Sequence, residues 1–103
     1  MSTFNDRERA FENKYAHDQE MMFKATSRRN RKIGLWAAAL LGKTGDEAEN
    51  YALDVIRTDF TKAGHDVVVE KLMADLGAHA DEATIRERMA HFLSEAKAEL
   101  SDG

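Results

Sequence analysis

The sequence predicts an all-α protein, a small four-helix bundle with a long first helix and a protruding, flexible N-terminal arm. Three observations lead to this fold class. Proline is absent from the 103 residues and glycine occurs only six times, so residues that interrupt helices are rare. Apolar side chains recur at helical spacing along most of the chain. Glycines next to helix-capping residues divide the chain into four segments.

The first helix is expected over residues 5–41, opened by Thr3 or Asn5 and ended by Gly42. Gly34 lies inside this helix, at a cost of roughly 1 kcal/mol relative to alanine. We interpret it as a place where another helix approaches closely, near the tryptophan ring; a hinge between arm and bundle is the alternative. The C-terminal half is the apolar half and must be the packed part: Ile33, Trp36, Ala37, Leu40 and Leu41.

The second helix is expected over residues 46–63, where Thr44 and Glu47 have the spacing of a capping box and Gly64 ends the helix. The third is expected over 66–76, with Asp66 as its N-cap. Each has an apolar face at helical spacing. The two faces are Ala48, Tyr51, Ala52, Val55, Ile56 and Phe60, and Val68, Val69, Leu72, Met73 and Leu76.

The fourth helix is expected over residues 81–100, after the stop at Gly77 and with Asp81 as N-cap. Short connections between the helices favour antiparallel neighbours and hence a bundle. The apolar face of this last helix is Ile85, Met89, Leu93, Ala96 and Leu100.

The first helix is too long for the bundle to cover. At 1.5 Å per residue it spans roughly 55 Å, whereas the second and fourth helices span roughly 27–30 Å. We therefore divide the chain into an N-terminal arm, residues 1–20, and a globular bundle, residues 21–103. One apolar stripe runs through both parts, within roughly 60° around the helix axis; its members are Phe4, Phe11, Tyr15, Met22, Ile33, Trp36 and Leu40.

The aromatic side chains of the arm have no bundle to bury them. Isolated helices of about 15 residues are marginal in water. We therefore expect the arm to be disordered or frayed alone and to fold on a partner. The alternative is an ordinary core contact, in which the arm folds back on its own bundle.

Charge is distributed unevenly along the chain. The net charge is −4, yet residues 24–43 contain six cations and no anion. An acidic protein with one basic belt is a poor general binder of nucleic acid. Within the belt, residues 24–32, the candidates for binding a phosphate or nucleotide are Lys24, Arg28, Arg31 and Lys32. We prefer the interpretation of these cations as a solvated outer flank. A nucleotide site is the alternative, and "GKTGD" lacks the glycine spacing of a Walker phosphate loop.

The sequence does not indicate a metal site, an enzyme active site or a membrane segment. Cysteine is absent and the four histidines form no HxxxH pair, so we expect no metal site. No nucleophile lies beside a base in the sequence pattern, and we expect no enzyme. No segment has the length and apolar character of a signal peptide or membrane span, so we expect no direct membrane insertion.

The motifs "AFENKYAHD" and "RRNRKIGLWAA" are long and specific. With them, essentially the whole chain resembles the ATPase-inhibitory zeta subunit of alphaproteobacterial F-type ATP synthases. The resemblance implies a four-helix protein that inhibits ATP hydrolysis. Its N-terminal segment, about residues 1–19, would insert as a helix at a catalytic α/β interface of the soluble head, next to the rotor. The contact residues carried over to this chain are Phe4, Arg7, Glu8, Phe11, Lys14, Tyr15 and Asp18.

The resemblance also implies the partners and the location. These are the α, β and rotor γ subunits of the synthase head, in the cytoplasm and peripheral to the inner membrane. We expect the free chain to be monomeric and to require no cofactor, with weak binding of ATP or ADP by the globular part. The alternative function is a small nucleotide-sensing or adaptor bundle that uses the basic belt 24–32.

Overall fold

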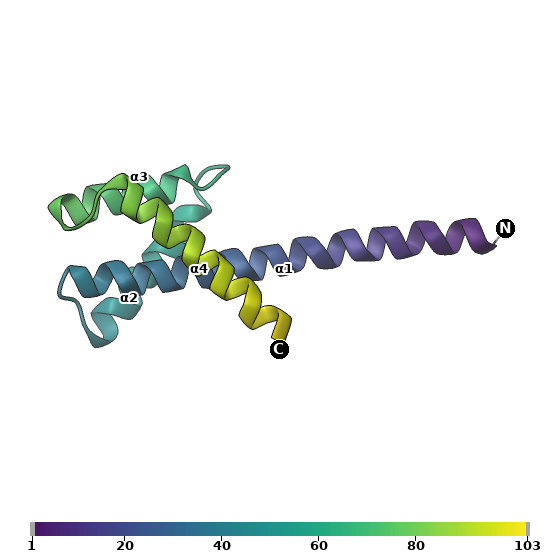
Figure 1. Cartoon of the computed structure of the whole chain (residues 1–103), viewed down its shortest axis with the longest axis horizontal. Helices are drawn as coiled ribbons and strands as arrows, with labels where there is room; N and C mark the ends of the chain where they lie inside the picture. The colour runs from purple at the N-terminus through teal and green to yellow at the C-terminus, as the bar shows by residue number, and fades with distance from the viewer. Residues whose placement is uncertain (1, 103) are drawn as a thin grey trace.

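The computed structural model describes the backbone of residues 2–102 and the side chains of residues 18–101. Within this range the chain consists of four α-helices and one short 3₁₀ helix, which confirms the all-α prediction and the long first helix (Figure 1). The elements are α1 (Ser2–Leu40), α2 (Gly45–Asp59), α3 (Asp66–Leu76), η1 (Gly77–His79) and α4 (Glu82–Asp102).

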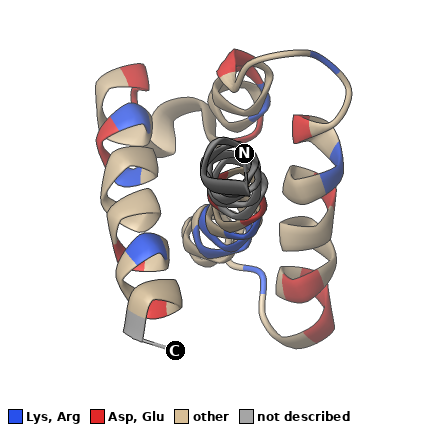
Figure 2. Cartoon of the chain, turned by 90° about the vertical axis from the view of Figure 1, so that its right-hand side faces the viewer, with Lys and Arg blue, Asp and Glu red and all other residues tan. Residues whose placement is uncertain are grey.

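Helix α1 is the central element of the fold. Seen along its axis, α4 and α2 lie on opposite sides of it (Figure 2), and these two helices make most of its contacts. Helix α3 bridges α2 and α4 and touches α1 only slightly. Figure 1 shows the N-terminal part of α1 extending beyond the other helices, in a molecule with extents of 62 × 26 × 21 Å.

The core forms where all four helices meet. The residues that the sequence places on apolar helix faces supply most of it. Among the described residues, the largest fully buried side chains are six aliphatic ones and one polar one, Asn30. The buried apolar cluster is Ile33, Ala37, Ala38, Tyr51, Val55, Val68, Val69, Leu72, Leu76, Ile85 and Met89.

The glycines predicted to stop helices α1 and α3 lie directly after or close to their ends, whereas α2 ends five residues before Gly64. Gly42, Gly64 and Gly77 all have positive φ angles, of 77°, 81° and 52°. Such angles are strained for residues with a side chain, so glycine is the natural residue at these stops. Asp81 is the predicted N-cap of α4, and its Oδ1 accepts a hydrogen bond of 2.8 Å from the Thr84 amide.

Several details of the helix ends differ from the prediction. Helix α1 begins at Ser2 instead of residue 5, and α3 begins at Asp66 itself, so that His65 and not Asp66 is its N-cap. Thr44 has the extended backbone of an N-cap (φ −138°, ψ 163°), but its side chain makes no capping hydrogen bond, so no capping box forms with Glu47. Helix α2 ends at Asp59 instead of residue 63. The amides of Phe60 and Thr61 bond to carbonyls three residues earlier, which tightens the last turn and releases the chain into a loop.

Three residues predicted for the core are exposed. Phe60 is 64% exposed because α2 ends before it, and it therefore leaves the apolar face of that helix. Met73 and Leu40 are 40% and 37% exposed, at the edges of the apolar faces of α3 and α1. In α1 the packed face instead includes Ala25, Arg29 and Asn30.

Gly34 allows α1 and α2 to touch. A Cβ atom at this position would lie 2.7 Å from the Cα atom of Ala52 and 3.1 Å from its Cβ atom. The prediction of a close helix approach is confirmed, although the neighbour is the backbone of α2 and not the ring of Trp36. Because Ala52 is itself small, the two backbones pack directly against each other at this crossing.

Candidate functional site

The residues predicted to bind a partner lie at the N-terminal end of α1. The side chains of Phe4, Arg7, Glu8, Phe11, Lys14 and Tyr15 lie outside the described residues, so their roles stay predictions. Asp18 is described and is exposed on α1. In the described part of α1, the first buried side chain is Ala25.

An open groove lies where α1 leaves the bundle. Its volume is about 410 Å³, and its walls come from α1 and from the end of α2 with the following loop. Two aromatic rings form its rim: the centroids of Phe23 and Phe60 are 5.8 Å apart. Phe23, Phe60 and Met22 are 57%, 64% and 46% exposed. The full lining is Gln19, Met22, Phe23, Thr26, Ser27, Asn30, Asp59, Phe60 and His65.

Below this aromatic rim, buried polar side chains join α1 to α2 and to the loop before α3. Arg29 and Asn30 are 4% and 2% exposed. The amide of Asn30 donates to Asp59 Oδ2 at 2.9 Å, and its carbonyl oxygen accepts from Arg29 Nη2 at 2.9 Å. Arg29 Nη2 lies 3.7 Å from Asp59 Oδ2, and His65 Nδ1 lies 2.9 Å from Asp59 Oδ1. We call these four residues the Arg29 cluster.

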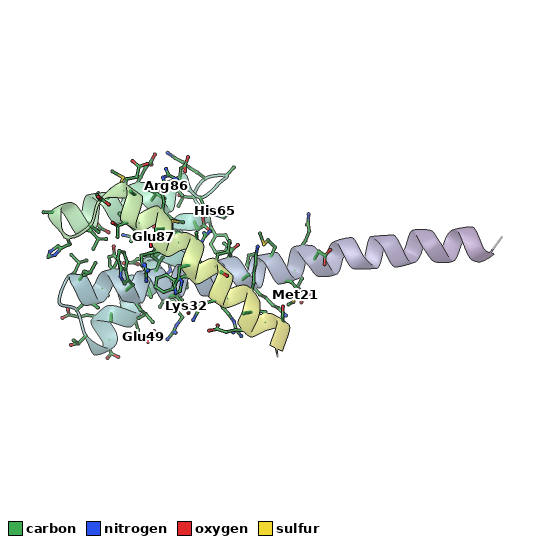
Figure 3. The ribbon with its side chains drawn as sticks, in the orientation of Figure 1. Met21, Lys32, Glu49, His65, Arg86 and Glu87 are labelled. Atoms are coloured by element: carbon green, nitrogen blue, oxygen red, sulfur yellow. The ribbon has the colours of Figure 1, made fainter. Side chains whose placement is uncertain are left out.

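Burial shapes the electrostatics of the Arg29 cluster. Desolvation lowers the pKa of Arg29, and the nearby carboxylate of Asp59 opposes that effect. His65 Nδ1 lies within hydrogen-bond distance of both Arg29 Nη2 (3.2 Å) and Asp59 Oδ1 (2.9 Å). One ring nitrogen cannot accept from the first and donate to the second at the same time. His65 sits at the end of the loop before α3, near the point where α1 leaves the bundle (Figure 3).

The cations of the basic belt form ion pairs with carboxylates of this chain. Lys24 pairs with Glu20 at 3.3 Å and Arg31 with Glu49 at 2.9 Å. On the other flank, Arg28 and Lys32 both reach the Glu99 carboxylate of α4. The structure thus brings Arg28, Arg31 and Lys32 around one shallow hollow of about 260 Å³, together with Glu99.

Lys32 is the centre of the α1–α4 ion pairs. Its ammonium lies 2.8 Å from Glu99 Oε2 and 3.1 Å from Glu95 Oε1. Hydrogen bonds to these carboxylates raise the pKa of Lys32, and the hydrogen bond from Lys32 lowers the pKa of Glu95 and of Glu99 below 4.5. Figure 3 shows Lys32 on α1 next to α4. Arg28 and Lys32 of the belt therefore link α1 to α4.

Acid is expected to remove this contribution to stability. A carboxylate whose pKa is lower in the folded state stabilises the fold above its unfolded pKa, here 4.5. That stabilisation is lost as the pH falls through the lower, folded pKa. The Lys32→Met variant should therefore be less stable than the parent at neutral pH, and the gap should close on acidification.

Thermal unfolding followed by circular dichroism from neutral pH to about pH 3 measures this gap. Lys97→Met is the matched control, since Lys97 is exposed on α4 and makes no ion pair among the described residues. A gap for Lys32→Met that is unchanged by pH would contradict the assignment.

A second polar hollow, of about 430 Å³, lies beside Tyr51. The Tyr51 hydroxyl donates to Asp75 Oδ2 at 2.8 Å, and Lys71 Nζ reaches the same oxygen at 2.9 Å. Desolvation and this hydrogen bond raise the pKa of Tyr51. Burial raises the pKa of Asp75, but hydrogen bonds from Lys71 and Tyr51 outweigh it and the net pKa is lowered. These groups satisfy one another and tie α2 to α3.

Neither a metal centre nor a membrane span is found in the described part of the chain. Among residues 18–101, no three His, Asp or Glu side chains gather closely enough to hold a metal ion. None of the described helices contains a stretch long and apolar enough to cross a membrane.

Comparison with known protein families shows to which family this chain belongs. Residues 1–99 match the family described as ATPase inhibitor subunit zeta. The chain belongs to this family. Membership in the zeta family makes it a regulatory subunit that inhibits the ATPase activity of ATP synthase, in agreement with the motifs quoted above.

A solved structure agrees with the fold of this zeta-family chain. A protein whose solution NMR structure is known is 46% identical, with a TM-score of 0.73. The alignment covers 80% of this chain and 96% of that one. No curated protein matches the sequence.

The groove and the Arg29 cluster were not predicted from the sequence. One signal was available, because Arg29 lies on the apolar stripe of α1, where a charged residue needs a buried partner. Its partners Asp59 and His65 lie 30 and 36 residues further along the chain, at the end of α2 and in a loop, and no spacing rule connects such positions.

Proposed function

We propose that this zeta-family chain inhibits ATP hydrolysis by inserting residues 1–20 as a helix at a catalytic α/β interface of the synthase head, next to the γ subunit. The contacts would come from Phe4, Arg7, Glu8, Phe11, Lys14, Tyr15 and Asp18. Phe11 and Tyr15 would be the apolar anchors, since large aromatic residues dominate most interfaces. The charged residues between them would fix register against polar walls of the interface.

The length of α1 is the observation that supports this proposal. The helix has 39 residues, against 15 in α2 and 21 in α4. The other helices pack on its C-terminal half, and the N-terminal part of its backbone extends past them (Figure 1). The sequence continues the apolar stripe into that part, and we propose that a partner outside the chain covers it. Residues 1–20 are therefore proposed as the inhibitory arm and 21–103 as its globular carrier.

Removal of the arm tests the proposal. Deleting residues 1–19 should abolish inhibition of ATP hydrolysis by the synthase head of the same organism. In the full chain, Phe11→Ser or Tyr15→Ser should each raise the half-inhibitory concentration by about tenfold or more. His17→Ser is the control, because position 17 lies roughly 200° around the helix from position 15. Full inhibition by the deletion variant would refute the proposal.

The alternative of a nucleotide-sensing or adaptor bundle gains no support from the geometry of the belt. ATP or ADP at Lys24, Arg28, Arg31 and Lys32 would have to displace Glu20, Glu49 and Glu99 from these cations. We propose weak nucleotide binding at most, which ATP-dependent shifts of the amide signals of residues 24–32 would reveal. Location in the cytoplasm at the inner membrane follows from binding to the synthase and is part of the same proposal.

A further inference from the structure

We propose that the groove between Phe23 and Phe60 is a second contact surface for the synthase head. It would receive apolar side chains of the α or β subunit beside the interface that holds residues 1–20. This inference rests on the proposed function, and it extends the inhibitory contact from the arm onto the bundle. The aromatic rim would then add to the affinity for the synthase head, while insertion of the arm would inhibit ATP hydrolysis.

The first support is the concentration of exposed apolar surface at this place. Single exposed apolar residues are ordinary on protein surfaces, whereas a contiguous group marks an interaction site. Phe23, Phe60 and Met22 are all about half exposed or more and line one hollow of about 410 Å³. The Phe60 ring contacts the Phe23 ring in a tilted arrangement, with an interplanar angle of 41°, and both rings remain exposed.

The second support is the charge of the groove. Among the described lining residues Asp59 is the only one with a carboxylate, and that carboxylate interacts with Asn30, Arg29 and His65. The cations of the belt lie elsewhere and are paired with carboxylates. A partner surface that matches this groove is therefore apolar, with neither a phosphate nor a strongly charged segment.

The third support is continuity with the arm. Position 22 follows position 15 by seven residues, about 10 Å along the helix and roughly 20° around it. Met22 thus lies on the same helix face as the aromatic positions proposed to enter the synthase. A partner that surrounds residues 1–20 must end next to Met22 and Phe23, where the groove opens.

A double variant of the full chain, compared with a single-substitution control, tests this surface. Phe23→Ser with Phe60→Ser should raise the half-inhibitory concentration by about tenfold or more, with the maximal inhibition at saturation unchanged because the arm is intact. Leu53→Ser is the control, since Leu53 is 45% exposed on α2 and lies outside the groove. Circular dichroism should report an unchanged helical fold for both variants, because the substituted side chains are exposed.

The arm variant Phe11→Ser with Tyr15→Ser is measured in parallel and separates the two proposals. If the arm variant inhibits like the parent chain, the proposed function fails. If the arm variant loses inhibition while the Phe23 and Phe60 variant keeps the parent's half-inhibitory concentration, the second contact surface is refuted and the proposed function stands.

A photo-crosslinking amino acid at position 60 identifies the occupant directly. We expect a crosslink to the α or β subunit in the inhibited complex, and none from the same amino acid at position 53. A crosslink to a second copy of this chain, or to its own residues 1–20, would assign the groove to that occupant and overturn the inference.

Discussion

Asp59→Ala is expected to lower the free energy of unfolding by about 3–5 kcal/mol, because it leaves the buried charge of Arg29 without its counterion. The side chains of Arg29 and Asp59 are only 5% and 9% exposed, so the unpaired guanidinium of Arg29 would be poorly hydrated. Asn30 and His65 would also lose hydrogen bonds of 2.9 Å. The cost therefore combines an unpaired charge with two lost polar contacts.

Urea unfolding followed by circular dichroism measures this loss. Asp54→Ala is the matched control on the same helix: Asp54 is 57% exposed and pairs only with Arg57 at 3.6 Å, so its removal should cost less than about 1 kcal/mol. The double variant Arg29→Met with Asp59→Leu should recover much of the stability, since buried pairs can be replaced by apolar residues at little cost. Equal losses for Asp59→Ala and Asp54→Ala would show that the Arg29 cluster does not hold α1 to α2.

The second large effect is expected at the crossing of α1 and α2. Gly34→Val should destabilise the fold by about 2–3 kcal/mol, because its added atoms overlap the backbone of Ala52, which cannot rotate away as a side chain can. The helix propensity gained by replacing glycine, less than about 1 kcal/mol, offsets only part of this cost. The helices must move apart, and their neighbours in the core lose contacts.

Thermal unfolding of Gly34→Val beside Ala39→Val tests this close approach. Ala39 is exposed on the same helix, so valine there should change stability by no more than about 0.5 kcal/mol. A Gly34→Val variant as stable as its control would mean that α1 and α2 are separated further than the structure shows.

The fold was largely predictable because its signals are local. The glycine stops, the Asp81 cap and the apolar faces of all four helices depend on residues within a few positions of each other. The end of α2 was misplaced because Gly64 is a strong stop, but the chain leaves the helix five residues before it. Phe60 was consequently assigned to the core, although it forms part of the rim of the groove.

The candidate site was predictable only in part, because the arm belongs to one helix whereas the groove and the Arg29 cluster are built from several elements. The arm is a single stretch of helix, so periodicity and length suffice to point to Phe11 and Tyr15. The groove and the Arg29 cluster join α1 to the end of α2 and the next loop. That juxtaposition depends on how helices cross, which helical periodicity does not specify.

The continuity of α1 has a consequence for how far the inhibitor can reach. An α-helix with its side chains is about 10–12 Å wide, whereas the bundle measures 26 × 21 Å across the long axis of the molecule. Met21 lines a hollow of about 210 Å³ together with Leu100 and Ser101, near the end of α4. In the proposed complex, an opening that admits one helix would therefore stop the chain at about this residue. The twenty residues before it would insert to a depth of roughly 30 Å. The wider bundle would remain outside, at the entrance of the interface.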